Sequence, residues 1–189
     1  MDYIETIVKD LDEIAIVEIN KYGIPSLEDY NDITYIAVEL AKKSNADIGV
    51  VQLGSKLMHI KLGQAISEKK REEHTNMAIG FAQEFFLNYP LNEVLKAKIF
   101  ACIREHKDKN FSCIESEICA NAKCYKFLVP KKILKMFYYY KARGYNYDEI
   151  FLIANEKVDE KWNNLTLDIC KKELENNYDK IKEFLELCK

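Results

Sequence analysis

Proline and glycine are scarce in this sequence of 189 residues, with three and six copies. Because these residues mark most turns between short strands, their scarcity argues against an all-β protein. No apolar run approaches the roughly 20 residues that cross a bilayer. The acidic start, MDYIETIVKDLDEIAIVEI, has no basic region and no small-residue cleavage site, so we do not expect a signal peptide. These absences predict a cytoplasmic protein without a membrane partner.

The sequence also lacks an excess of basic residues. Its 28 Lys and Arg stand against 31 Asp and Glu, which gives a formal net charge of -3. General nucleic-acid binding needs a basic surface, so we do not expect it. A composition of 48% hydrophobic and 31% charged residues is typical of a folded globular protein. The length suits a single domain, and we predict one over residues 1–189.

Apolar residues recur at helical spacing along the chain, which predicts an all-α protein. After Pro25, Ser26 is the predicted N-cap of a helix whose apolar stripe consists of Ile33, Ile36, Ala37, Leu40 and Ala41. Asn92 is the predicted cap of a later helix. A further amphipathic helix is predicted to start at Pro130 and to end at Gly144.

We expect the core of the domain to span about residues 26–145, with closing helices over 146–189. The N-terminal helix, residues 1–22, is predicted to be peripheral. The last helix carries an apolar stripe at nearly heptad spacing, formed by Leu167, Cys170, Leu174, Ile181, Phe184 and Cys188. Such a stripe either docks on the core of its own chain or pairs with a second copy, so a homodimer is one expected partner.

The six cysteines include no CxxC pair. The closest run, Cys113, Cys119 and Cys124, does not have the spacing of a zinc knuckle. Because unpaired cysteine behaves mostly as a small hydrophobe, buried or scattered thiols are the favoured interpretation. A metal cluster or a regulatory disulfide is the alternative.

Only three histidines are present, and all three fall at inward positions. His59 ends an apolar segment, and His74 and His106 lie on the apolar faces of two other predicted helices. A single histidine on an apolar face is more often a core residue than a ligand. Inward imidazoles from separate helices are nevertheless how helical bundles build metal or phosphate sites. Periodicity alone leaves both interpretations open.

Four segments in a fixed order resemble the HD-domain superfamily of metal-dependent phosphohydrolases. They read VVQLGSKLMHI, REEHTNMAIGFAQEFF, KIFACIREHK and ESEICANAKCYKF, and the resemblance extends from about Ser26 to the C-terminus. It implies a single-domain orthogonal helical bundle of the HD-domain type. It also implies that His59 is the histidine of the His-Asp pair, and that His74 and His106 are the histidines of the next two helices. These three are therefore the candidate catalytic residues, and the candidate metal ligands if a metal is retained.

The sequence departs from the family pattern where the carboxylates are expected. Ile60 stands at the aspartate of the His-Asp pair, and the two later aspartates fall on Asn121 and Lys123. Isoleucine offers neither charge nor lone pairs, and an inward lysine repels a cation or replaces it. With Arg104, a basic neighbour of His106, Asn121 and Lys123 are the candidate ligand-binding residues.

A displaced carboxylate from the set Glu72, Glu73, Glu105 and Asp108 is less favoured than a surface role for these side chains. The favoured function is a divergent HD-domain protein with a degraded metal site and no metal cofactor. It would bind a phosphorylated small molecule or nucleotide without the normal hydrolysis. One alternative is an active phosphomonoesterase or phosphodiesterase with an unusual metal set of Mn, Fe, Ni or Zn. Another is a structural protein that dimerises through the KMFYYY segment or the last helix.

Overall fold

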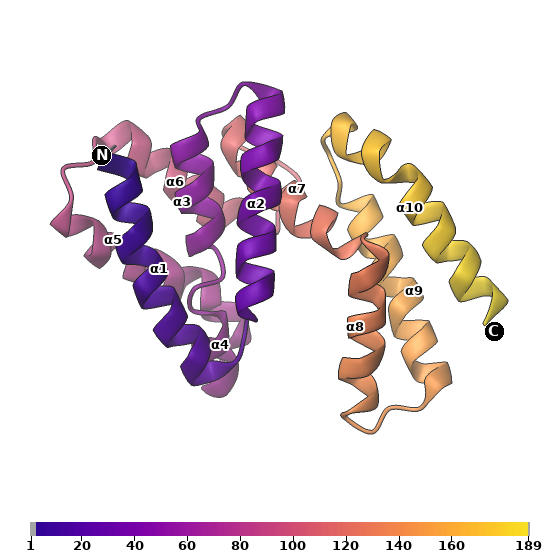
Figure 1. Cartoon of the computed structure of the whole chain (residues 1–189). Coiled ribbons are helices and arrows are strands. Elements are labelled where there is room, and N and C mark those ends of the chain that lie inside the picture. Colours follow the sequence, from indigo (N-terminus) through magenta and orange to yellow (C-terminus); the bar gives the residue numbers. More distant parts are fainter. Residues whose placement is uncertain (1–2, 189) are drawn as a thin grey trace. The chain divides into compact units, whose positions relative to one another are not determined.

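In this computed structural model, which describes residues 3–188, every regular element is a helix (Figure 1). The α-helices are α1 (Tyr3–Tyr22), α2 (Leu27–Ser44), α3 (Ile48–Leu57), α4 (Leu62–Ser67), α5 (His74–Phe85), α6 (Glu93–Glu105), α7 (Ile114–Phe127), α8 (Pro130–Lys141), α9 (Tyr147–Asn163) and α10 (Asp168–Leu187). Two short 3-10 turns are η1 (Arg71–Glu73) and η2 (Phe86–Asn88). The predicted all-α fold class is confirmed.

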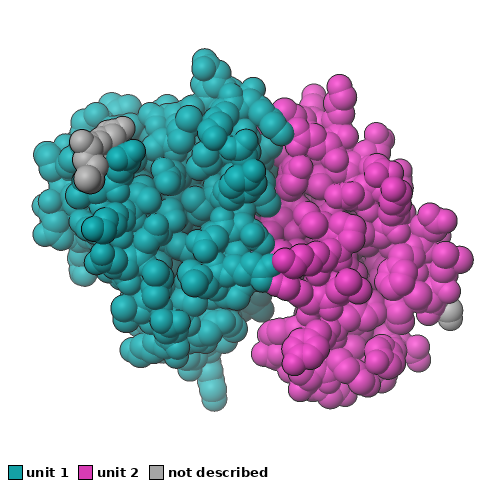
Figure 2. Space-filling view, in the orientation of Figure 1, with its two compact units in different colours: residues 1–122 teal, residues 123–189 magenta. Residues whose placement is uncertain are grey.

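The chain divides into two compact units, residues 1–122 and residues 123–189, which Figure 2 colours teal and magenta. Their boundary falls within α7. The expected division into a core of residues 26–145 and closing helices of residues 146–189 differs from this boundary. That a single domain spans residues 1–189 stays a prediction.

In unit 1, the N-terminal helix α1 contributes to the core. Ile7 and Leu11 are fully buried, and Ala15 and Ile19 are 1% and 8% exposed. These four residues are spaced by four, so one face of α1 packs against α3 and α4. The helix expected to be peripheral is instead an integral part of unit 1.

Three carboxylates fasten α1 to later parts of unit 1. The Asp10 carboxylate accepts a hydrogen bond from the Tyr89 hydroxyl at 2.7 Å. The Asp12 carboxylate accepts hydrogen bonds at 2.6 Å from Lys56 Nζ and at 2.7 Å from the Tyr30 hydroxyl. In addition, Glu18 lies 3.1 Å from Lys61 Nζ. These contacts set the register of α1 against the helices that it covers.

Helix α3 lies at the centre of unit 1, where it packs against α2 on one side and α6 on another. Gly54 permits the close approach of α6. A Cβ atom built at this glycine would lie 2.4 Å from Cys102 Cβ and 2.8 Å from Cys102 Sγ. Because real Cβ atoms do not approach a neighbour so closely, no larger residue fits here without moving a helix.

The capping residues predicted from the sequence occupy their expected positions. The Ser26 hydroxyl accepts a hydrogen bond from the Asp29 backbone at 3.1 Å, and the Asn92 side chain accepts one from the Leu95 backbone at 2.9 Å. Each cap satisfies a backbone N–H that the first turn of a helix leaves without a partner. Pro130 occupies the first turn of α8, where it sacrifices no helical hydrogen bond.

Unit 2 contains α8, α9 and α10, and α9 packs against both of the others. The stacked rings of Trp162 and Tyr178, with centroids 4.4 Å apart, join α9 to α10. On α10, Cys170, Leu174 and Ile181 of the predicted stripe are buried, whereas Phe184 is 45% exposed. Pairing of this helix with a second chain stays a prediction.

The contribution of Glu160 on α9 to the stability of the fold can be tested by its pH dependence. Lys157 and Lys161 donate hydrogen bonds to its carboxylate at 2.6 and 2.7 Å. Burial acts to raise the pKa of this carboxyl, but the two lysines outweigh burial and lower the pKa to about 2. A carboxyl with a lower pKa in the folded chain stabilises the fold above its unfolded pKa, and this contribution is lost as the pH falls.

We therefore expect Glu160→Gln to be less stable than the parent protein at pH 7. The difference should shrink as the pH falls from 4.5 toward about 2. Urea denaturation at a series of pH values measures the difference in the free energy of unfolding between the two proteins. Glu156→Gln, at an exposed position of the same helix, is the matched control. Equal pH dependence of the two variants would contradict the role of the lysine pair.

All six cysteines lie in the described part of the chain, and none of them forms a disulfide. Four of them are buried, namely Cys102, Cys119, Cys124 and Cys170. This agrees with the interpretation of buried or scattered thiols. Among the described helices, none combines the length and the apolar character needed to span a membrane.

Candidate metal and phosphate site

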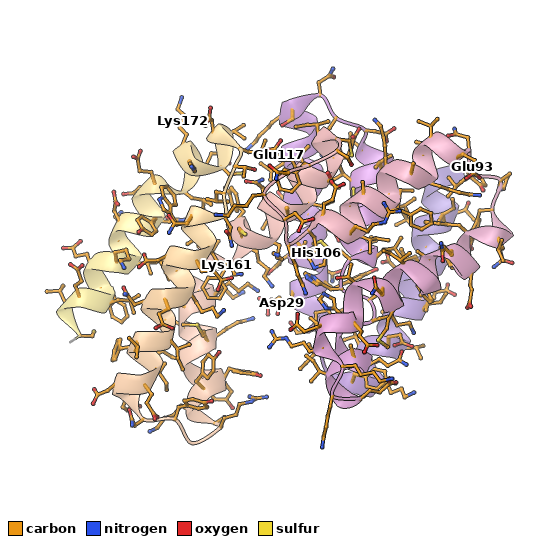
Figure 3. All side chains as sticks on the ribbon, turned by 180° about the vertical axis from the view of Figure 1, so that it is seen from behind. Asp29, Glu93, His106, Glu117, Lys161 and Lys172 are labelled. Carbon is orange, nitrogen blue, oxygen red and sulfur yellow. The ribbon has the colours of Figure 1, made fainter. Side chains whose placement is uncertain are left out.

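The three histidines of the sequence lie together in unit 1. His59 follows the end of α3, and His74 is the first residue of α5. His106, which Figure 3 labels, directly follows α6. The ring centroid of His106 lies 5.0 Å from that of His59 and 5.4 Å from that of His74. One potential ligand atom from each ring lies within 4.8 Å of the other two. The structure therefore gathers all three predicted histidines into one group.

Two of these rings are oriented by the same local hydrogen bond. His74 Nδ1 lies 2.8 Å from the Arg71 carbonyl oxygen, and His106 Nδ1 lies 2.7 Å from the Ile103 carbonyl oxygen. Because a carbonyl oxygen only accepts, each Nδ1 carries the proton and donates it. In the neutral rings the lone pair is then on Nε2. The two Nε2 atoms face each other at 3.3 Å.

Both His74 and His106 are buried, at 2% and 1% exposure, whereas His59 is half-buried. Burial lowers the pKa of the His74 imidazole, and the positive charges of Lys107 and Arg71 act in the same direction. The neutral imidazole is thus favoured, and this is the form that binds metals.

Arg71 and Lys107 were not among the residues that the sequence indicated. Their charges act on His74, so both lie where an anionic ligand of the histidine group would experience them. Lys107 also lies 3.8 Å from the Glu72 carboxylate, whose side chain is 90% exposed. A signal was present in the sequence, because Lys107 directly follows His106 and Arg71 precedes His74 by three residues.

The donor set decides which ions fit the group. It consists of three imidazole nitrogens and contains no carboxylate among the described residues. Imidazole suits borderline ions such as Zn²⁺ and Ni²⁺, whereas Mg²⁺ and Mn²⁺ prefer oxygen ligands. The residues fit a single borderline ion and do not fit a set that depends on carboxylates. Such an ion, when bound, supplies positive charge and a Lewis acid.

Two positions that the sequence assigned to lost carboxylates are now located. Ile60, the residue after His59, is 5% exposed, so its side chain is buried. Asn121 on α7 is fully buried, and its Nδ2 donates a hydrogen bond to the Glu117 carbonyl oxygen at 2.9 Å. The side-chain amide retains a carbonyl oxygen as a neutral acceptor.

The two basic candidates lie in different surroundings. Arg104 is exposed, and its guanidinium carbon lies 5.9 Å from the centroid of the Phe100 ring. Two residues along a helix separate Arg104 from His106, which directs the two side chains to nearly opposite faces. Lys123 is the first residue of unit 2. The binding roles of both residues stay predictions.

Glu105, one of the possible displaced carboxylates, is already engaged in other contacts. Its oxygens accept hydrogen bonds from the Ser112 backbone at 2.9 Å, from the Ser112 hydroxyl at 2.7 Å and from the Ser116 hydroxyl at 2.6 Å. Burial acts to raise the pKa of Glu105, but these serine contacts outweigh it and lower the pKa. Glu105 therefore connects α6 to α7 and is held away from a ligand role.

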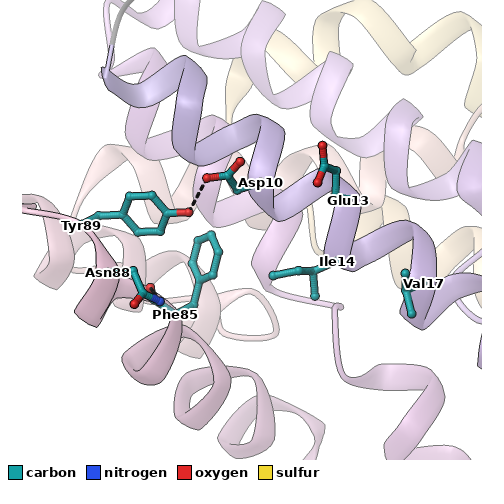
Figure 4. Close-up of a pocket in the computed structure, with 7 residues that line it drawn as sticks. All are labelled: Asp10, Glu13, Ile14, Val17, Phe85, Asn88 and Tyr89. Atoms are coloured by element: carbon teal, nitrogen blue, oxygen red, sulfur yellow. Dashed lines mark hydrogen bonds between the residues drawn. The ribbon is translucent and has the colours of Figure 1, made fainter.

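Two surface cavities lie elsewhere, and neither is lined by a histidine. One of about 520 Å³ is lined by Asp10 and Glu13 of α1 and by Phe85 and Tyr89, among others, and Asp10 points toward Tyr89 (Figure 4). Burial and the hydrogen bond to Asp10 raise the pKa of Tyr89 to about 12, so its hydroxyl remains a donor. The other, of about 440 Å³, is lined by residues of α8 and α10. Neither cavity is part of the histidine group.

The helical arrangement is that of the HD-superfamily hydrolases. An HD-superfamily hydrolase from Bacillus thuringiensis has a similar structure, with a TM-score of 0.74 at 14% identity, over 97% of this chain and 93% of that one. A predicted HD superfamily hydrolase from an uncultured Thermotogales bacterium gives a TM-score of 0.71 at 14% identity, over 94% and 88% of the two chains. The HD-type fold that the resemblance implied is confirmed.

A third similar structure is that of Bacillus subtilis YpgQ in complex with ADP. Its TM-score is 0.66 at 16% identity, over 97% of this chain and 95% of that one. Identities this low establish the fold alone. No family model matches the sequence, and no curated protein matches it.

Proposed function

We propose that this chain is a divergent HD-fold protein that binds a phosphorylated small molecule or a nucleotide at the histidine group. In this proposal it does not perform the metal-dependent hydrolysis of the family. The observation that carries the proposal is the group itself, which brings three imidazole ligand atoms within 4.8 Å of one another and includes no carboxylate among the described residues. Binding of an anionic ligand therefore depends on nearby cationic side chains.

Two cationic side chains are near the group and could attract an anion. The charges of Lys107 and Arg71 both act on His74, and the exposed Glu72 carboxylate acts in the opposite direction. Hydrogen bonds from cationic side chains are strong contacts for phosphate oxygens. The complex of similarly folded YpgQ with ADP makes a nucleoside diphosphate the first candidate ligand. In the same proposal Asn121 is a ligand-binding residue.

The loss of hydrolysis rests on the position after His59. Ile60 stands where the family places the aspartate of its His-Asp pair, and its buried side chain offers no lone pair to an ion or a water molecule. Without anionic oxygens, a pair of hard ions lacks both ligands and charge compensation. The chain then retains the ligand site of the fold and loses the usual way of activating water.

An active phosphohydrolase with an unusual metal set is the second candidate. It is favoured by the facing Nε2 atoms of His74 and His106, 3.3 Å apart, because this arrangement presents two lone pairs to one point. In that case the histidines hold the ion and position a phosphoester. The two candidates differ in whether a phosphoester is hydrolysed.

The two candidates are separated by a binding and turnover experiment with ADP. We expect calorimetry to show saturable ADP binding. With Mn²⁺, Ni²⁺ or Zn²⁺, we expect phosphate release from ADP and p-nitrophenol release from bis(p-nitrophenyl) phosphate to stay at background. Lys107→Ala should weaken ADP binding about threefold, because a partly exposed charge contributes up to about 1 kcal/mol. Loss of the buried His106 in His106→Ala should weaken it about tenfold or more.

Lys172→Ala, at an exposed lysine of α10 (Figure 3), is the control for the lysine variant and should bind ADP normally. Circular dichroism and melting temperature report whether His106→Ala remains folded. Hydrolysis of either substrate well above background that disappears in His74→Ala would replace the first candidate by the second. Absence of ADP binding under all conditions would remove the nucleotide proposal.

A further inference from the structure

A groove in unit 2 leaves apolar side chains open to solvent. It lies between α8 and α10, both of which pack on α9 (Figure 1), and its volume is about 440 Å³. Its described lining consists of Pro130, Lys131, Ile133 and Leu134 of α8 and of Lys180, Ile181 and Phe184 of α10. Small-molecule pockets have volumes of about 300–1,000 Å³. The groove is therefore large enough to hold a small molecule.

The walls of this groove are mostly apolar. Ile133 and Ile181 are buried, but Leu134 and Phe184 are 66% and 45% exposed. The Phe184 ring contacts the Phe151 ring of α9, with centroids 6.4 Å apart, so it is supported from within unit 2. Large apolar side chains that a fold leaves exposed together often mark a binding site. An aliphatic chain in the groove would remove this surface from water.

The only ionisable side chains in the described lining are cationic, namely those of Lys131 and Lys180. Lys180 is exposed and forms no ion pair with any residue that the structure describes. Its acidic neighbours on α10, Asp179 and Glu183, lie outside the described lining. The first turn of α8, which begins at Pro130, carries no acidic side chain, and the N-terminal end of a helix favours negative charge. The polar end of a ligand in this groove is therefore expected to be an anion.

The short length of the groove favours a small ligand over a partner helix. Its lining covers little more than one turn of each helix, residues 130–134 of α8 and residues 180–184 of α10. Leu187, further along α10, is 81% exposed and lies outside the described lining. A helix that binds in a groove needs apolar contacts over several turns. A single aliphatic chain needs only one short apolar wall.

We propose that the groove between α8 and α10 binds a small amphiphile with one aliphatic chain and an anionic head group, such as a medium-chain carboxylate. The aliphatic chain lies against Leu134 and Phe184. The head group lies at Lys180 and Lys131, beside the first turn of α8. This site belongs to unit 2, whereas the histidine group belongs to unit 1. The inference therefore goes beyond the proposed function and does not depend on it.

Calorimetry on the full chain with hexanoate, octanoate and decanoate tests the apolar wall. Each methylene group that becomes buried raises the affinity by up to about fourfold. We therefore expect the affinity to rise roughly tenfold from hexanoate to octanoate. Octylamine has the same aliphatic chain and a positive head group, so it should bind at least about tenfold more weakly than octanoate.

Variants of the lining locate the site. Phe184→Ala and Leu134→Ala should each weaken octanoate binding about fivefold, because each removes part of the apolar wall. Leu187→Ala, at an exposed leucine of α10 outside the lining, is the matched control and should bind octanoate normally. Lys180→Ala should weaken octanoate binding about threefold and leave the binding of 1-octanol unchanged. Its control is Lys172→Ala, at an exposed lysine of the same helix.

Circular dichroism reports whether each variant remains folded, and the mostly exposed position of Leu134 makes its variant the safer of the two. Octanoate binding that is equally tight in the parent protein, Phe184→Ala and Leu134→Ala would overturn the proposal. An affinity that does not rise with chain length, or equal affinity for octylamine and octanoate, would overturn it as well. Binding to phosphatidylglycerol vesicles without binding of free octanoate would also overturn it, and would indicate a membrane surface as the partner.

Discussion

Replacing Gly54 with alanine is expected to lower the free energy of unfolding by about 3 kcal/mol. The added Cβ would lie 2.4 Å from Cys102 Cβ, well inside van der Waals contact. Neither atom belongs to the flexible end of a side chain, so relief requires α3 and α6 to separate. Since Cys102 is fully buried, the neighbouring core must shift with it.

Chemical denaturation followed by far-UV circular dichroism measures this loss. Gly80→Ala on α5 is the matched control, because a Cβ there meets no atom within 4 Å. Alanine is the better helix former, so this control should gain about 0.5–1 kcal/mol. A Gly54→Ala variant within about 0.5 kcal/mol of the parent protein would show that α3 and α6 tolerate a larger separation.

The second large effect is expected for Asp12→Ala. Lys56, with a side chain only 6% exposed, pairs with Asp12 at 2.6 Å, and its Nζ lies 4.6 Å from the centroid of the Tyr30 ring. Removing the carboxylate leaves a buried ammonium without its counter-charge. We expect a loss of about 3 kcal/mol, the lower end of the range for breaking a buried ion pair, because the Asp12 side chain is 38% exposed.

The Lys56→Met variant separates two effects, the loss of the ion pair itself and the cost of a buried ammonium without a counter-charge. It removes the ammonium, fills a similar volume, and leaves Asp12 accessible to water and bonded to Tyr30. This variant should lose only about 1 kcal/mol, and the double variant should resemble it, because the two residues act as a pair. Urea denaturation of all four proteins completes the cycle. A smaller loss for Asp12→Ala than for Lys56→Met would refute the assignment.

Helix positions were readable from the sequence because their determinants are local. The caps at Ser26 and Asn92 each involve a backbone group three residues away. The burial of α1 was not readable in the same way. The apolar face at Ile7 and Leu11 indicates an amphipathic helix. Helical periodicity does not indicate which later helix packs against that face. The sequence therefore left α1 peripheral, although it belongs to the core of unit 1.

In the candidate site, too, some features follow from the local sequence and others depend on how helices distant in the sequence pack together. The inward positions of His74 and His106 follow from periodicity, and the resemblance added the order of the segments. The facing of their Nε2 atoms at 3.3 Å depends on how α5 and α6 cross and on which carbonyl each ring finds. The positions of Arg71 and Lys107 relative to the histidine group depend on the same packing.

The fastening of α1 also has a consequence for synthesis on the ribosome. Lys56 follows Asp12 by 44 residues, and Tyr89 follows Asp10 by 79. Helix α1 therefore leaves the exit tunnel before these partners exist, and up to 79 further residues are made before each contact can form. During that interval its apolar face is open to chaperones, and contacts over such long sequence separations slow the final closure.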